Sequence, residues 1–138
     1  MVNDQISHML TKIRNANLAK HNFTLVNHTK LNLALLSVLQ AEGYIKNYTV
    51  ESFEFNKLKI KVFLSYKGWW IKKPLFSILK RISKPGHRVF SSYKKFNTFI
   101  TTLHYQQGMA IISTSIGIMS HNKAVIMKQG GEILCYIE

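Results

Sequence analysis

The chain has 138 residues, 46% of them hydrophobic, so it can bury an apolar core as one domain or two small lobes. Nineteen Lys and Arg against six Asp and Glu give a formal net charge of +13, whose self-repulsion is costly unless a polyanion neutralises it. RNA or DNA is the common partner of such a chain and an anionic membrane surface the less common one. Its single cysteine, Cys135, excludes an internal disulfide and a multi-cysteine metal site. No apolar run approaches the roughly 18 residues of a membrane span, and the opening residues do not predict a signal or transit peptide.

Hydrophobic spacing predicts two helices in the first half of the chain. Apolar residues at three- and four-residue steps indicate a helix over residues 4–18, with either Asn3 or Asp4 as its N-cap. Thr29 is the expected N-cap of a second helix, and Gly43 suits the position just beyond its end.

Alternating apolar and polar residues predict strands around these helices. A short strand is expected over residues 23–26, extended chain over 44–50 and a half-buried strand over 57–64. The last strand would bury Leu58, Ile60, Val62 and Leu64 and expose a row of lysines. The first half therefore predicts an α/β amino-terminal lobe, residues 1–67, in the order helix, strand, helix, strand, strand.

The second half has the texture of a mostly antiparallel β lobe with short helices, residues 68–138. Its expected elements are short strands on either side of Pro85, a helix over 96–103, a strand over 109–112 that stops at Ser113, a helix from the cap Ser120 to Met127, and a strand over 132–137. The fold class predicted for the whole chain is α+β, with two small lobes.

Residues 67–95 contain nine basic residues and no acidic one. Aromatic residues are interleaved with them: Trp69, Trp70, Phe76, Phe90 and Tyr93. Cations for phosphates and flat side chains for stacking are what an RNA surface requires. For any single residue, a solvated cation or a core aromatic is the more ordinary explanation. For the stretch as a whole, the absence of acids favours nucleic acid.

The run Ser113-Thr114-Ser115, followed by Gly117, offers hydroxyls that could bond to base edges, sugars and phosphates. A nearby glycine permits close approach of a nucleic-acid backbone, although such a run is more often an ordinary loop or helix cap.

Enzymatic function is not predicted. The six acids form no convincing acid–base pair, and the six histidines show no His-x-x-x-His spacing. Gly130-Gly131 lacks the remainder of a phosphate-binding loop, and Gly-x-Ser-x-Gly is absent. No catalytic residue, metal or cofactor is expected, and no small-molecule substrate.

Several segments in order along the chain resemble the bacterial-type small-subunit ribosomal protein eight. They are residues 9–16 (Met-Leu-Thr-Lys-Ile-Arg-Asn-Ala), 42–45 (Glu-Gly-Tyr-Ile), 81–89 (Arg-Ile-Ser-Lys-Pro-Gly-His-Arg-Val), 113–119 (Ser-Thr-Ser-Ile-Gly-Ile-Met) and 130–137 (Gly-Gly-Glu-Ile-Leu-Cys-Tyr-Ile). Because the similarity spans nearly the whole chain, it is more specific than any one motif.

The resemblance implies a structural constituent of the small ribosomal subunit that binds a stem of the rRNA central domain and supports assembly, beside neighbouring ribosomal proteins. The residues it implicates in specific RNA contact are Ser113, Thr114, Ser115 and Gly117. It implicates Arg14, Asn15 and Lys30 in the amino-terminal lobe, and Lys84, Arg88 and Lys94 elsewhere. Glu132 is expected to orient the loop from its strand.

The chain departs from the family pattern at a few of these places. Ile116 stands where the family usually has Lys, and Phe90 where Tyr is common. Ser120-His121-Asn122 replaces Thr-Asp-Arg, which keeps the cap hydroxyl but loses both charges.

Lys outnumbers Arg sixteen to three, and Asn, Ile, Phe and Tyr are plentiful, as in genes rich in A and T. We therefore expect an organelle-encoded protein of the mitochondrial ribosome, with a plastid or bacterial cytoplasm as the alternatives.

Other functions are weighed against this one. A non-specific basic RNA-binding chaperone is the first alternative. A nuclease or RNA-modifying enzyme would need a metal or cofactor site that the sequence does not predict. A membrane-surface protein is supported by Trp69-Trp70 and Lys72-Lys73 alone.

Overall fold

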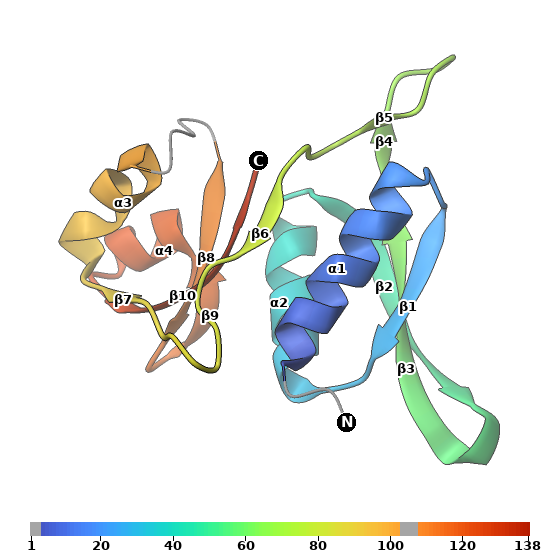
Figure 1. Cartoon of the computed structure of the whole chain (residues 1–138), viewed down its shortest axis with the longest axis horizontal. Helices are drawn as coiled ribbons and strands as arrows, with labels where there is room; N and C mark the ends of the chain where they lie inside the picture. Colours follow the sequence, from blue (N-terminus) through green and yellow to red (C-terminus); the bar gives the residue numbers. More distant parts are fainter. Residues whose placement is uncertain (1–3, 103–107) are drawn as a thin grey trace. The chain divides into compact units, whose positions relative to one another are not determined.

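A computed structural model describes residues 4–102 and 108–138, and the chain divides into two compact units, Met1–Phe76 and Ser77–Glu138 (Figure 1). The fold is α+β, as the sequence predicted. The first unit has the expected order of helix, strand, helix, strand, strand, and the second is an antiparallel sheet with short helices.

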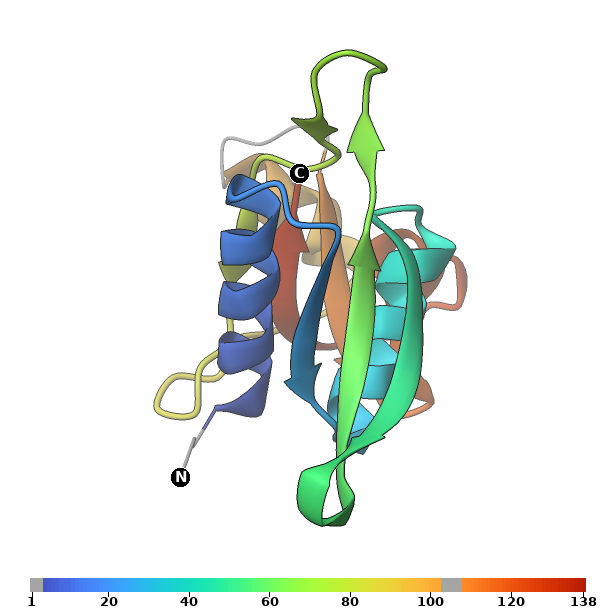
Figure 2. The same ribbon diagram turned by 90° about the vertical axis from the view of Figure 1, so that its right-hand side faces the viewer.

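The first unit packs its helices on one side of a sheet with the strand order β1-β3-β2 (Figure 1). Its elements are α1 (Gln5–Leu18), β1 (Phe23–Asn27), α2 (Lys30–Ala41), β2 (Ile45–Phe53), η1 (Glu54–Asn56), β3 (Lys57–Leu64), β4 (Tyr66–Lys67) and β5 (Lys73–Pro74). Both β1 and β2 pair antiparallel with β3, which lies between them in Figure 2.

The ends of both helices are set by local residues, as the sequence predicted. The Asp4 carboxylate caps α1 by accepting a hydrogen bond from the Ser7 amide at 3.2 Å. The Thr29 hydroxyl caps α2 by accepting one from the Asn32 amide at 3.0 Å. Gly43 follows α2 with a φ of +82°, a left-handed conformation that glycine adopts without strain.

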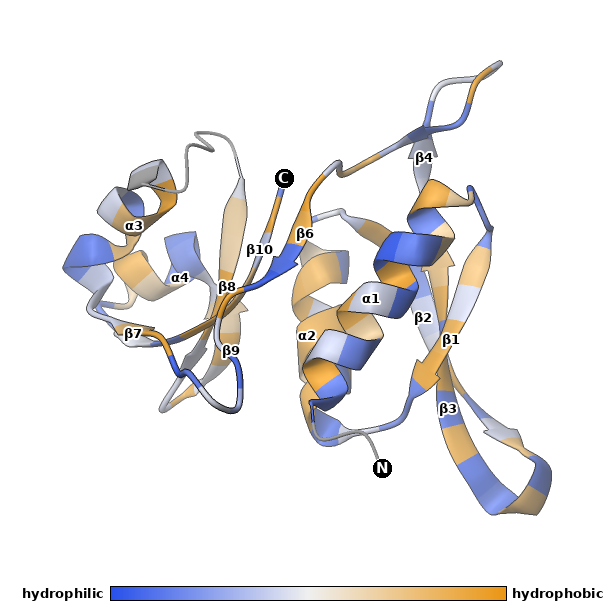
Figure 3. Cartoon of the chain, viewed as in Figure 1, coloured by the Kyte–Doolittle hydropathy of each residue, from blue (hydrophilic) through white to orange (hydrophobic). Residues whose placement is uncertain are grey.

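The alternation along β3 places Ile60, Val62 and Leu64 in the core and the lysines outward, a pattern visible in Figure 3. The prediction that Leu58 would also be buried is wrong, because its side chain is 49% exposed. It lies next to the β2–β3 turn, where no helix covers the sheet, so alternation alone does not bury it.

The first unit extends past residue 67, where the sequence placed the boundary. Residues 66–76 are tied to the end of α1 and the chain after it: the Tyr66 hydroxyl donates to the His21 carbonyl, and the Asn17 amide donates to the Phe76 carbonyl at 3.1 Å. These contacts group the β4–β5 hairpin with the amino-terminal unit.

We expect Asn17→Ala to lower the free energy of unfolding by about 1–3 kcal/mol, because the variant leaves the buried Phe76 carbonyl without this donor. Urea unfolding measures the change. Asn15→Ala, at an exposed position of the same helix, is the matched control and should be nearly neutral. Equal stability of the two variants would contradict the prediction.

The second unit is built around its final strand. Its elements are β6 (Leu79–Arg81), β7 (Phe90–Ser91), η2 (Tyr93–Lys95), α3 (Phe96–Thr102), β8 (Met109–Thr114), β9 (Gly117–Ser120), α4 (His121–Ile126) and β10 (Gly131–Ile137). The strand order is β6-β10-β8-β9, and β7 also pairs with β10. Leu103, the expected end of α3, lies outside the described residues.

The core of the second unit lies between this sheet and its helices. Ile112, Ile133 and Tyr136 of the sheet pack in one cluster with Phe96 of α3 and Ala124 of α4. The Ser120 hydroxyl caps α4 as predicted, accepting a hydrogen bond from the Lys123 amide at 3.4 Å.

Candidate RNA-binding site

The hydroxyl run lies on a tight β-hairpin. The prediction that the strand stops at Ile112 is wrong: β8 continues to Thr114 and returns as β9, with Thr114 paired to Gly117. Ser115 and Ile116 form the exposed turn, and Gly117 has a φ of +135°. The glycine allows this reversal, which a residue with a Cβ would adopt only with strain.

The three hydroxyls differ in how they are used. Thr114 Oγ1 donates to the Gly117 carbonyl at 2.7 Å and accepts from the Ile116 amide at 3.3 Å, so it holds the turn. Ser115 is exposed and its Oγ donates to Gln129 Oε1 at 3.5 Å, the limit of a hydrogen bond. Ser115 can therefore turn to an external ligand at little cost. Sequence reasoning missed Gln129, since no local pattern links it to the hairpin.

Strand register brings residues from four strands into one row at this end of the sheet. Glu132 of β10 pairs with Phe90 of β7 on one side and with Ser113 of β8 on the other. Ser113 in turn pairs with Ile118 of β9. The hydroxyl run and the chain after the Pro-Gly loop thus share one end of the second unit.

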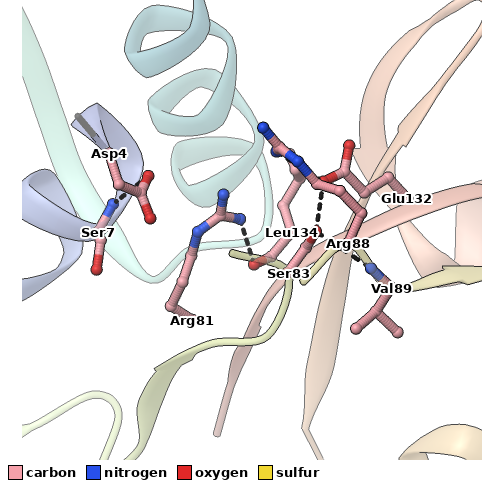
Figure 4. A network of polar contacts seen from close by, with 8 residues as sticks. All are labelled: Asp4, Ser7, Arg81, Ser83, Arg88, Val89, Glu132 and Leu134. Atoms are coloured by element: carbon pink, nitrogen blue, oxygen red, sulfur yellow. Dashed lines mark hydrogen bonds and ion pairs between the residues drawn. The ribbon is translucent and has the colours of Figure 1, made fainter. Parts of the chain in front are cut away.

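Glu132 is the centre of a polar network at this row (Figure 4). Its carboxylate accepts hydrogen bonds from the Ser83 hydroxyl and from Arg88 Nη1, the latter at 3.0 Å. Ser83 is fully buried, and its Oγ also accepts a bond from the Val89 amide at 3.3 Å. Beside them Arg81 Nη1 donates to the Leu134 carbonyl at 2.7 Å. Through these bonds Glu132 orients the chain that follows the Pro-Gly loop.

Burial raises the pKa of the Glu132 carboxyl, but the hydrogen bonds from Ser83 and Arg88 and the charges of Arg88 and Arg81 outweigh it. Its pKa therefore lies below the ordinary value for Glu, and the group carries a charge that holds Arg88 in place. Ser83 was not singled out from the sequence, because its contact to Glu132 spans 49 positions.

This lowered pKa predicts a pH dependence of stability. A carboxyl whose folded pKa is depressed stabilises the fold above its unfolded pKa, and this contribution is lost as pH falls through the folded pKa. Glu132→Gln should therefore be clearly destabilising near neutral pH and nearly neutral at about pH 3. Urea unfolding at both pH values measures this. Glu51→Gln, which removes a more exposed ion pair to Lys61, should show little change at either pH. A destabilisation by Glu132→Gln that is independent of pH would refute this account.

The predicted basic residues lie on exposed parts of the second unit. Lys84 and His87 close a tight turn through Pro85 and Gly86, with backbone bonds of 2.9 and 3.0 Å between them. This turn and the β8–β9 turn lie at the same end of the unit in Figures 1 and 2, on opposite sides of the sheet. Lys94 is exposed on η2, its Nζ 5.9 Å from the centre of the Tyr93 ring.

The amino-terminal candidates belong to the first unit and are all exposed. Arg14 and Asn15 lie near the end of α1, and Lys30 begins α2. The two helices run in the same direction, so Lys30 and the α1 pair lie toward opposite ends of the helical layer (Figure 1).

The departures from the family pattern have different structural settings. Ile116 is 55% exposed in the turn and Phe90 is 70% exposed, so both present apolar surface at the candidate site. His121 instead is buried, and its Nδ1 accepts a hydrogen bond from the Ala110 amide at 3.1 Å. Its role is inside the fold.

Other kinds of site find little support in the described residues. Within 4–102 and 108–138, no three His, Cys, Asp or Glu residues are grouped so that they could hold a metal ion. None of the helices in the described part of the chain is long and apolar enough to span a membrane. Cys135 is fully buried, and burial raises the pKa of its thiol to about 12, which leaves it unreactive.

Comparison with known proteins connects this arrangement with one family. The family model described as "Ribosomal protein S8" matches residues 4–137. The chain is 48% identical over 137 residues to "Small ribosomal subunit protein uS8c" of Gracilaria tenuistipitata var. liui, with 99% of each chain covered. It is 46% identical over 138 residues to the protein of that name from Cyanophora paradoxa, again covering 99% of each. The protein "Small ribosomal subunit protein uS8" of Trichormus variabilis is 45% identical over 135 residues, 98% of this chain and 97% of that one.

These relatives are plastid and cyanobacterial. They do not support the mitochondrial assignment, which rested on an A+T-rich residue usage that plastid and mitochondrial genomes share, and they favour the plastid or bacterial alternative. The resemblance found in the sequence is confirmed over nearly the whole length. The chain belongs to the ribosomal protein S8 family.

Proposed function

We propose that this chain is a structural, non-catalytic protein of the small ribosomal subunit that binds a stem of the rRNA central domain during assembly. The observation that carries the proposal is the family match over residues 4–137, together with relatives named as small-subunit proteins at 45–48% identity. The net charge of +13 supports a polyanionic partner. Neighbouring small-subunit proteins are the other expected partners.

The geometry suggests a division of roles within the second unit. The β8–β9 hairpin, with Ser113, Thr114, Ser115 and Gly117, would make the selective contacts to an irregular part of the stem. Lys84, Arg88 and Lys94 would neutralise phosphates on the same unit. In the first unit, Arg14, Asn15 and Lys30 would contact the RNA backbone.

We place the protein in the plastid. The plastid relatives support this location, and so does a Lys-rich, Arg-poor composition typical of A+T-rich organelle genes.

The test is binding to a short stem from small-subunit rRNA and to a scrambled duplex of equal length, across a salt series. A structural rRNA-binding protein should prefer the stem at every salt concentration, while the affinity for both falls with salt as counterions are released. Equal affinity for the two RNAs would leave the basic chaperone as the better description.

A further inference from the structure

The hairpin Tyr66–Pro74, formed by β4 and β5 and called the tryptophan hairpin below, exposes large aromatic groups. Trp69 and Trp70 are 92% and 90% exposed, and Ile71 is 64% exposed. The two indole rings lie 5.7 Å apart at an angle of 48°. Figures 1 and 2 both show the hairpin extending beyond the β1-β3-β2 sheet of its unit.

The hairpin is anchored at its base. The Tyr66 hydroxyl donates to the His21 carbonyl, and Lys72 Nζ donates to Asn22 Oδ1 at 2.9 Å and lies 5.6 Å from the centre of the Tyr66 ring. At the tip Gly68 has a φ of +94°, and a Cβ there would meet the Ile71 carbonyl at 2.6 Å. The tip is therefore a defined turn that displays both tryptophans to solvent.

The surroundings of the rings are cationic and polar. Lys67, Lys72 and Lys73 flank them, and no acidic residue occurs in the sequence between Glu54 and Glu132. Beside the hairpin base is a depression of about 480 Å³ lined by Lys20, His21, Asn22, Phe23 and Lys72. It offers ammonium, imidazole and amide groups to a phosphate or a base edge.

We propose that the tryptophan hairpin binds a single-stranded RNA segment. Unpaired bases stack on Trp69 and Trp70, and the adjoining phosphates bind the lysines and the depression at the base. Bases inside a duplex cannot present their faces to the rings, so the hairpin selects unpaired RNA. A lipid surface would use the indoles but would leave the polar donors of the depression without a role. The site is distinct from the β8–β9 hairpin, and it rests on the proposed function only in that the strand belongs to rRNA.

Intrinsic fluorescence tests this directly, because Trp69 and Trp70 are the only two tryptophans in the chain and both lie in the hairpin. Titration with a short oligoadenylate should quench the emission, whereas an RNA duplex of equal length should quench it far less. Equal quenching by both RNAs, or none by either, would overturn the proposal. A blue shift with phosphatidylglycerol vesicles and no quenching by oligoadenylate would assign the hairpin to a membrane instead.

Variants supply the second measurement, the affinity for end-labelled oligoadenylate by anisotropy. Trp69→Ser with Trp70→Ser should weaken binding at least about tenfold, from the loss of base stacking. Phe55→Ser, at a 91% exposed aromatic in the β2–β3 turn, is the matched control and should bind like the parent chain. An unchanged affinity in the double variant would overturn the proposal.

The rRNA stem separates this proposal from the proposed function. If the parent chain prefers the stem but oligoadenylate does not quench it, the hairpin assignment alone fails. If oligoadenylate quenches it but the stem is not preferred, the hairpin assignment stands and the stem-binding function fails.

Discussion

Gly131→Ala should lower the free energy of unfolding of the second unit by about 3 kcal/mol, a large fraction of the stability of a small domain. A Cβ at this position would lie 2.1 Å from the Ser113 carbonyl oxygen and 2.9 Å from its carbon. Both contacts are with backbone of the neighbouring strand β8, so no side-chain rotation relieves them. The strands β10 and β8 must separate where Glu132 pairs with Ser113.

Urea unfolding followed by circular dichroism measures this loss. Gly86→Ala is the matched control, since a Cβ at Gly86 meets nothing within 4 Å and the residue needs no left-handed conformation. It should leave the stability nearly unchanged. If the two variants unfolded at the same urea concentration, the close approach of β8 and β10 at Gly131 would be wrong.

Thr114→Ala should reduce the preference for the rRNA stem over a scrambled duplex by about tenfold, the value of one or two hydrogen bonds. The Thr114 hydroxyl bridges the Gly117 carbonyl and the Ile116 amide, so its loss loosens the turn that presents Ser115. The phosphate contacts lie elsewhere, on Lys84, Arg88 and Lys94. The dependence of affinity on salt should therefore be unchanged.

Competition binding in a salt series measures both quantities. Thr114→Ser keeps the hydroxyl and removes only a methyl group, so it should retain most of the preference. Ser115→Ala leaves both turn bonds intact and should also reduce the preference if Ser115 contacts RNA. A variant Thr114→Ala that bound the stem as well as the parent chain would argue against a selective role for this hairpin.

Local chemistry explains why much of the fold could be predicted. The caps Asp4, Thr29 and Ser120 each bond to an amide three residues away, and the helical periodicity of α1 spans a few turns. Such signals lie within short windows of sequence. The basic residues Lys84 and Arg88 could be predicted as exposed for the same reason, because they flank a Pro-Gly turn.

Long-range pairing explains what could not be predicted. Strand β9 has few residues and was hidden in the hydroxyl run, since only its pairing with β8 makes Gly117 to Ser120 a strand. The Glu132 network depends on residues 44 and 49 positions away. The exposure of Trp69 likewise follows from how β4 and β5 are anchored, which no hydropathy pattern reveals.

Strand β10 has a consequence for the order in which a newly made chain can fold. The sheet of the first unit pairs residues 23–64 among themselves, so it can form while later residues are still being synthesised. By contrast β6 and β7 both pair with β10, which follows them by about 40 residues or more, and stay without that partner until residues 131–137 leave the exit tunnel. Glu132, which holds Arg88, is among these residues. A nascent chain thus acquires its hydroxyl-bearing end last, and an unfinished chain cannot occupy the rRNA site in place of a finished one.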